Sequence, residues 1–187
     1  MAEVGQIFEY LNELAPVELK MDFDNVGLLV GNAEAKVEKC LVALDITDEV
    51  IEEAVRLGTQ LIVSHHPIIF GAIKSVTADD LIGRKIIALI RNNISAVCMH
   101  TNLDIAEGGL FRQRADGSRA EHLCFAEHLD GVAVRPRLIL AREVQVNIRH
   151  LAAAEAEEGL KRNVKAVLNV LLSLIHISEP TRLDVIS

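Results

Sequence analysis

The chain has 187 residues, half of them apolar, which is enough for a compact domain with a real core and argues against disorder. Its 27 acidic residues outnumber its 19 basic ones and give a net charge of -8, so we expect no nucleic-acid partner. No run of about 18 apolar residues occurs, and no basic segment followed by an apolar stretch opens the chain. We therefore expect no membrane span and no signal peptide, and we predict a cytoplasmic protein.

The amino-terminal residues predict a helix followed by a loop and a short strand. Apolar residues from Val4 to Leu14 fall at helical spacing, and Pro16 ends the pattern. In the next segment, "DFDNVGLLVG", we interpret Asp24 and Asn25 as part of a turn that leads into an apolar strand, with a place in the lining of the functional site as the alternative.

A regular alternation of strands and helices follows. Short aliphatic runs predict strands, and amphipathic segments between them predict helices, the first of which is capped by Thr47 or Asp48 and ends at Gly58. The predicted strands are 40–46, 60–64 and 94–99, and the predicted helices are 47–58 and 80–93. This order predicts an α/β fold with a parallel β-α-β-α-β sheet half-lobe covered by helices, and with an irregular or helical C-terminal remainder.

Polar side chains follow all three predicted strands. The first strand ends at Asp45, the second at His65 and His66, and the third at His100 with Asp104 shortly after it. Ligands of open parallel sheets collect beyond the carboxyl ends of the strands. We therefore expect these five side chains to gather at one edge.

The residue types at this edge favour a metal centre. Imidazole suits zinc and iron, and a carboxylate such as Asp104 supplies the negative charge that two dications need. Adjacent side chains of an extended chain point to opposite sides, so we expect His65 and His66 to hold different ions of a close pair. Two ions about 3.5 to 4 Å apart are typical of metal-assisted hydrolysis.

Other interpretations of the same residues stay open. A single histidine at a strand end is more often a hydrogen-bonding cap than a ligand, although an adjacent pair shifts the balance toward metal. Asp45 can order the turn before Thr47. His100 can orient a ligand rather than bind metal itself. The glycines do not form a nucleotide-binding motif. We expect the three cysteines, Cys40, Cys98 and Cys124, to be free thiols.

Four ordered motifs carry a resemblance: "DFDNVGLLVG", "LVALDIT", "LIVSHHPIIF" and "MHTNLDIAEGG". Together, over residues 1–109, they resemble the amino-terminal part of the GTP cyclohydrolase 1 type 2 homologue family of dinuclear metal proteins. The resemblance implies that His65, His66 and Asp104 are metal ligands, and that the cofactors are two divalent ions of zinc, iron or manganese. It also implies an α/β fold with two related lobes, a homohexamer, and metal-dependent opening of the GTP ring.

The same resemblance implies further ligands that this sequence does not supply. The family has a histidine and, four residues later, a glutamate, but no His-x-x-x-Glu follows Asp104. His176 and Glu179 are three residues apart in an unrelated context, and the role is not transferred to them. We therefore expect an incomplete metal site and a chain that is inactive as it stands.

The composition changes after Gly109. Residues 1–109 contain three arginines and five lysines, whereas 112–149 contain seven arginines and no lysine. We interpret 1–109 as the metal-binding α/β lobe, 110–150 as an unassigned segment for which a shifted reading frame is our hypothesis, and 151–187 as a helical segment with an artefactual tail. A genuine, divergent insertion with a basic face is the alternative, and an intact frame in the underlying nucleotides would establish it.

Two classes of function remain for these residues. One is a metal-dependent hydrolase that acts on a nucleotide-like substrate. The other is a non-catalytic scaffold or regulatory interaction protein whose metals stabilise its assembly.

Overall fold

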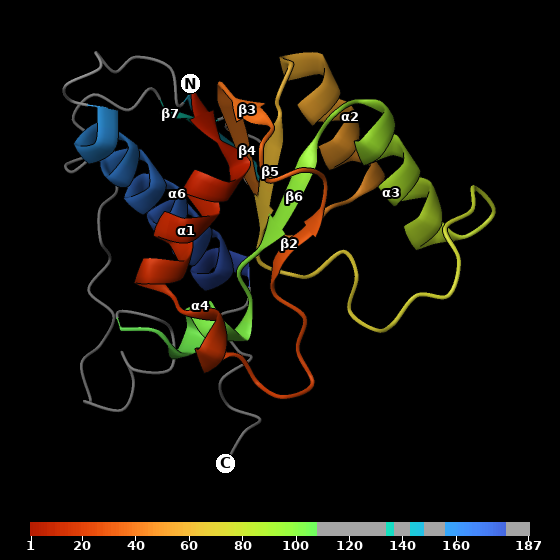
Figure 1. Cartoon of the computed structure of the whole chain (residues 1–187), viewed down its shortest axis with the longest axis horizontal. Coiled ribbons are helices and arrows are strands. Elements are labelled where there is room, and N and C mark those ends of the chain that lie inside the picture. Colours follow the sequence, from red (N-terminus) through yellow and green to blue (C-terminus); the bar gives the residue numbers. More distant parts are fainter. Residues whose placement is uncertain (108–133, 137–142, 148–155, 179–187) are drawn as a thin grey trace.

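A six-stranded sheet lies at the centre of the molecule, in a computed structural model that describes residues 1–107, 134–136, 143–147 and 156–178 (Figure 1). Its three central strands are parallel and neighbour one another in the order β6, β5, β4. They are β4 (Lys39–Ala43), β5 (Leu61–Ser64) and β6 (Ser95–Cys98), and they are connected by α2 (Asp48–Leu57) and α3 (Leu81–Arg91). The predicted β-α-β-α-β unit is confirmed.

Antiparallel strands extend this unit on both sides. β2 (Gly27–Val30) pairs with β6. Its apolar run predicted this strand. On the other side β8 (Glu143–Asn147) pairs with β4, and β7 (Val134–Pro136) pairs with β8. The segment 110–150 is therefore not wholly irregular. No strand was predicted at 143–147, although polar and apolar residues alternate there. β8 forms where the open edge of β4 offers its backbone hydrogen bonds.

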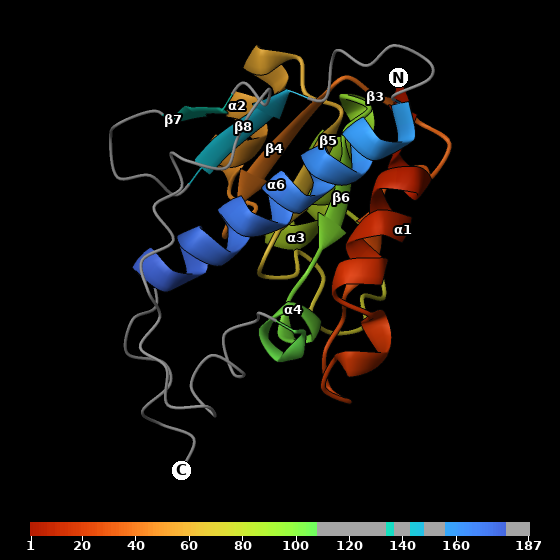
Figure 2. The same cartoon turned by 90° about the vertical axis from the view of Figure 1, so that its left-hand side faces the viewer.

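The strands send alternate side chains into two separate cores. On β4, Cys40 and Val42 belong to one core and Leu41 and Ala43 to the other. The first core lies beneath α1 (Val4–Leu14) and α6 (Ala156–Ser178), and the second beneath α2 and α3. The figures show these helix pairs on opposite faces of the sheet (Figures 1 and 2).

Helix α6 lies across the face that it shares with α1 (Figure 2). Val164, Val167 and Leu171 of α6 are fully buried in the core there. The helical character predicted for this segment is confirmed. The remaining short elements are β1 (Ala2–Glu3), η1 (Val17–Leu19), β3 (Lys36–Val37) and α4 (Thr101–Ile105), of which β1 and β3 form a separate two-stranded sheet.

The helices that connect the parallel strands have well-defined ends. Thr47, rather than Asp48, caps α2, and its side chain accepts a hydrogen bond from the Val50 amide at 3.2 Å. Gly58 ends this helix in the left-handed conformation, with φ of 63°. Asp80 caps α3 in the same manner as Thr47 caps α2. These caps fix the ends of the two connecting helices.

Two of the cysteines are free and buried, as expected, and Cys124 lies outside the described residues. Burial raises the pKa of the Cys40 thiol to about 12, and burial likewise raises the pKa of Cys98. Both are therefore neutral and poor nucleophiles at physiological pH. Within the described part of the chain, no helix combines the length and apolar character that crossing a membrane requires.

Gly31 fixes the contact between β2 and β6. Its φ is +111°, and a Cβ at this position would lie 2.7 Å from the Ser95 backbone. We predict that Gly31→Ala lowers the free energy of unfolding by about 3 kcal/mol, because it adds backbone strain to a steric clash. Gly58→Ala is the control, since its φ is also positive but no atom lies within 4 Å. It should cost about 1 kcal/mol. Urea unfolding measures both, and equal losses would contradict the steric argument.

Candidate metal centre

The carboxyl ends of the three parallel strands bring the candidate ligands to one edge of the sheet. Ala43 pairs with Ser64, and Ser64 pairs with Cys98, so that the residues beyond these positions continue side by side. Backbone hydrogen bonds extend the alignment past the strand ends: His65 donates to the Ala43 carbonyl at 3.2 Å, and Met99 donates to the Ser64 carbonyl at 2.9 Å. The histidines that follow β5 and β6 are neighbours for this reason.

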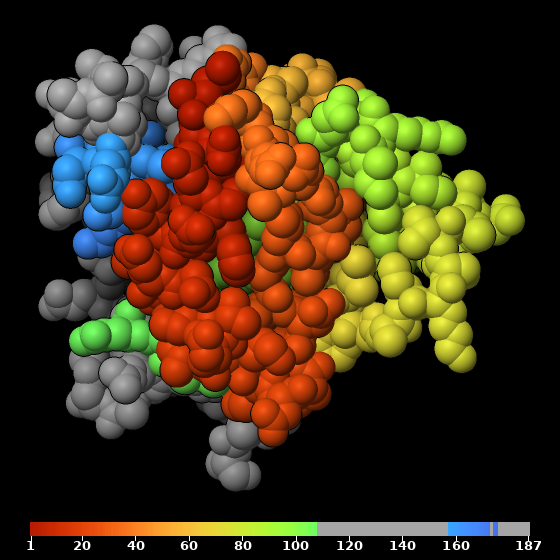
Figure 3. Space-filling model, viewed as in Figure 1, coloured from red at the N-terminus to blue at the C-terminus, as the bar shows by residue number. Residues whose placement is uncertain are grey.

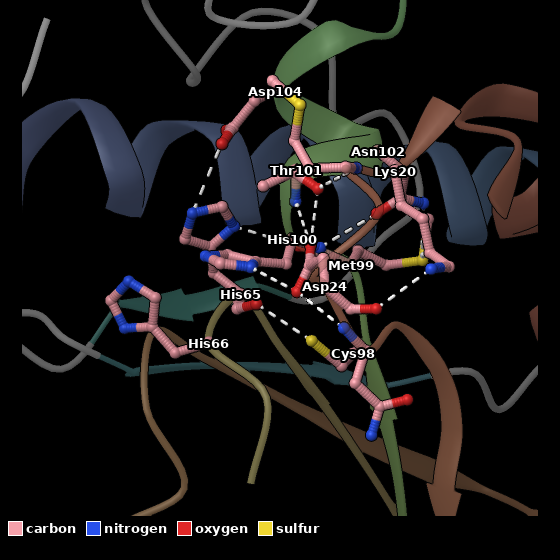
Figure 4. Close-up of polar contacts among 12 residues, drawn as sticks. Lys20, Asp24, His65, His66, Cys98, Met99, His100, Thr101, Asn102 and Asp104 are labelled. Atoms are coloured by element: carbon pink, nitrogen blue, oxygen red, sulfur yellow. Dashed lines mark hydrogen bonds and ion pairs between the residues drawn. The ribbon is translucent and has the colours of Figure 1, made fainter. Parts of the chain in front are cut away.

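Three imidazole rings meet at this edge (Figure 4). The ring centroid of His65 is 5.0 Å from that of His66 and 4.9 Å from that of His100, and the last two are 5.6 Å apart. One ring nitrogen from each residue lies within 4.8 Å of the other two. Since imidazole nitrogen is a common metal ligand, this cluster can hold a metal ion.

The expectation that His65 and His66 point to opposite sides is wrong. It assumed an extended chain, but β5 ends at Ser64 and the backbone bends at both histidines. The alternation of a strand therefore no longer applies, and both rings turn toward the same space. The adjacent pair can contribute to a single ion.

Each imidazole has an oxygen acceptor at Nδ1. His65 Nδ1 lies 3.0 Å from the Met99 carbonyl oxygen, His66 Nδ1 lies 2.8 Å from Asp45 Oδ1, and His100 Nδ1 lies 2.9 Å from Asp24 Oδ1. A carbonyl or an ionised carboxylate can only accept, so each Nδ1 carries the hydrogen. The lone pair of each neutral ring is then on Nε2. This is the usual arrangement of metal-binding histidines, whose second nitrogen donates to a protein oxygen.

Both predicted carboxylates reach the cluster. Asp104, on α4, is 9% exposed, and its Oδ1 lies 3.9 Å from His65 Nε2. Asp45 is half exposed and bonds His66 from the end of β4. The fold thus brings together the five residues that the sequence placed at this edge. The roles of His65, His66 and Asp104 as ligands stay a prediction.

Asp24 also belongs to this site, although the sequence favoured a turn for it. Its side chain is fully buried, although it precedes His100 by 76 positions in the chain. One carboxylate oxygen accepts from His100 and from the Asn25 amide, and the other accepts from the amide and hydroxyl of Thr101. Lys20 Nζ donates to the Asp24 backbone carbonyl at 3.0 Å (Figure 4). Asp24 therefore fixes the orientation of the His100 ring.

These donors also keep Asp24 ionised. Burial by itself would raise the pKa of this carboxyl, but the hydrogen bonds from Thr101 and His100 outweigh it and lower the pKa below its usual range. A negative charge therefore lies against His100, one of the three imidazoles, where it would favour a bound cation.

The protein is thus an α/β protein with a sheet covered by helices. Its candidate metal centre is the imidazole cluster at the carboxyl ends of the parallel strands. The family model Duf34/NIF3 (NGG1p interacting factor 3) matches residues 2–178, and the chain belongs to this family. The match includes α6 as well as the strands that carry the histidines.

Curated relatives carry the name that the sequence motifs indicated, "GTP cyclohydrolase 1 type 2 homolog". The protein from Clostridium perfringens is 48% identical over 108 residues, which are 58% of this chain and 41% of the relative. That from Clostridium acetobutylicum is 44% identical over 108 residues, which are 58% of this chain and 40% of the relative. The chain thus spans about two fifths of the length of these relatives. The predicted family resemblance is confirmed.

Solved structures agree with this assignment. A Staphylococcus aureus protein is 37% identical, with a TM-score of 0.56 over 61% of this chain and 37% of its own. Reduced HcgD from Methanocaldococcus jannaschii is 34% identical, with a TM-score of 0.56 over 61% of this chain and 46% of its own. A Bacillus cereus protein related to NIF3 shares the fold, with a TM-score of 0.57 and 24% identity over 88% of this chain and 58% of its own.

The buried network of Asp24 predicts a large effect of removing its charge. Asp24→Asn replaces one acceptor oxygen with an amide that faces donors, and we expect it to lower the free energy of unfolding by about 2 kcal/mol. Asp22→Asn makes the same chemical change at an exposed position two residues away and should change stability by less than about 0.5 kcal/mol. Thermal unfolding followed by circular dichroism measures both. Equal stability of the two variants would show that the Asp24 bonds contribute little.

Proposed function

We propose that this chain binds divalent metal through His65, His66 and Asp104, with His100 as a further donor, and that its function is the metal-dependent hydrolysis of a nucleotide-like substrate. One observation carries the proposal: three imidazoles converge while each donates from Nδ1 to a fixed oxygen. Histidines that serve only as strand caps have no reason to present their Nε2 atoms to one common space.

These donors fit zinc or iron better than they fit an ion that prefers oxygen ligands alone. Three imidazole nitrogens favour a borderline-soft metal, and Asp104 adds an oxygen ligand that manganese also accepts. His100 supplies the third nitrogen of the set, and its bond to the buried Asp24 holds it in place. Asp45 bonds His66 at Nδ1, so it orients this ring rather than competing for the ion.

We propose a dinuclear centre, as the family resemblance implies. Three imidazoles and Asp104 are four donors, which satisfy one tetrahedral ion or, shared between two ions, leave open positions on both. The His-x-x-x-Glu pair that the resemblance implies does not follow Asp104 in this sequence, so the proposed centre rests on these four donors.

The chemistry that such a centre supplies when loaded is the activation of water at neutral pH and the polarisation of a substrate oxygen. The protein's own residues prepare the space for it. The Met99 carbonyl, Asp45 and Asp24 orient the three rings, and the packing of His65, which is only 1% exposed, excludes solvent from one side. The charge of Asp24 supports cations in this space.

The remaining parts of the proposal concern partners. The name of the relatives suggests GTP, so we propose a nucleotide substrate. A homohexamer and a cytoplasmic location complete the proposal, together with the absence of nucleic-acid and membrane partners.

Metal content per chain tests the centre. We expect the wild-type protein to take up about two ions of zinc, iron or manganese per chain, and His66→Ala to take up at least one fewer, because it removes a ligand. Asn92→Ala, an exposed change at the opposite end of β6, is the control and should bind as the wild type does. Atomic emission spectrometry after dialysis gives the ratio, and a wild-type protein without metal would refute the proposal.

Sedimentation of the same samples separates the two classes of function. If the metal serves catalysis, His66→Ala should lose metal and keep the assembly of the wild type. An assembly that dissociates when the metal is lost would instead favour a metal-stabilised scaffold or regulatory interaction protein.

A further inference from the structure

Two phenylalanine rings lie in solvent on the two loops that carry Asp24 and the His65–His66 pair. Phe23 is 67% exposed and Phe70 is 54% exposed. Their ring centroids are 6.4 Å apart, and their planes are inclined by 47°. Phe8, in contrast, packs against the core. An aromatic pair that remains exposed next to a cluster of polar groups is typical of ligand-binding surfaces.

Both rings are tied to the residues of the centre. Phe23 directly precedes Asp24, whose carboxylate accepts the hydrogen bond from His100. Phe70 directly follows Ile69, whose carbonyl accepts a hydrogen bond of 2.7 Å from Asn25 Nδ2. The bond from Asn25 thus joins the loop before β2 to the loop after β5, and each loop carries one of the rings.

The same two loops carry further exposed apolar side chains. Met21 is 42% exposed on the first loop, and Ile73 is 43% exposed on the second. In Figure 3 the orange segment before β2 and the yellow segment after β5 border each other on the same face of the molecule. The two loops that carry the phenylalanine rings are therefore neighbours on this face.

We propose that Phe23 and Phe70 form a stacking surface for the planar heteroaromatic ring of the substrate, so that the substrate's reactive part reaches the imidazole cluster. This inference rests on the proposed hydrolase function and names the class of substrate that it uses. Phenylalanine offers an aromatic face and no hydrogen-bonding group, so the surface selects a flat ring without distinguishing one base from another.

The geometry of the pair says how a ring binds. Two rings 6.4 Å apart and inclined by 47° already pack against each other, so no third ring fits between them. The ligand ring stacks on the outer face of one phenylalanine, and the other supports that phenylalanine from behind. Loss of either ring therefore weakens binding.

Calorimetric titration with two probes tests the inference. GTP carries a heteroaromatic ring, and inorganic tripolyphosphate carries a similar charge without one. We expect Phe23→Leu and Phe70→Leu each to weaken GTP binding about tenfold, because leucine keeps the apolar surface but removes the stacking face. Neither should change tripolyphosphate binding or metal content. Ile90→Ala, which alters an aliphatic side chain 57% exposed on α3, is the control and should change nothing.

Other results overturn the inference. GTP binding that is absent in the wild type or unchanged in both variants, or an equal loss for the two probes, would show that no ring stacks there. A variant that binds GTP normally but sediments as a smaller assembly would make the pair a contact between subunits. Titrations with and without zinc, iron or manganese keep the two proposals distinguishable: a protein that binds none of these ions refutes the metal centre, while ring-dependent GTP binding still reports on stacking.

Discussion

The candidate site depends on the register of the parallel strands. The last residues of β4, β5 and β6 lie side by side, and they are Ala43, Ser64 and Cys98. A shift of one residue would exchange the side chains between the two cores, whose shapes each fit their present side chains. The packing of the cores therefore holds the register, and the register brings together donors from three distant parts of the sequence.

Orientation requires more than proximity, and the three rings are oriented in different ways. A backbone carbonyl holds His65, a partly exposed carboxylate holds His66, and a buried carboxylate holds His100. The buried carboxylate of Asp24 needs hydrogen-bond donors most, because an ionised group without donors would be strongly destabilising in this position. Thr101 and the chain around Asp24 supply these donors, so the short helix α4 and the turn before β2 stabilise each other as well as the ring between them.

The sequence predicted the parts of this structure that depend on local pattern. The aliphatic runs of β4, β5 and β6, the Thr47 cap and the Gly58 end of α2 are each defined within a few residues. It did not predict β8, whose partner is about a hundred positions away, or the role of Asp24, which becomes visible only when the fold places it against His100. It was wrong about the directions of His65 and His66 because a strand rule was applied just beyond the end of a strand. The residues nearest a functional site are those for which regular-structure rules fail first.

One short turn connects the buried and exposed parts of the site. Phe23 and Asp24 are adjacent, yet the first lies mostly in solvent while the side chain of the second is fully buried. Because four donors hold the Asp24 carboxylate, this turn cannot shift without breaking several buried hydrogen bonds. The position of the Phe23 backbone is therefore fixed relative to His100 before any ligand arrives. Such preorganisation of the loop would lower the entropy lost when a ligand binds there.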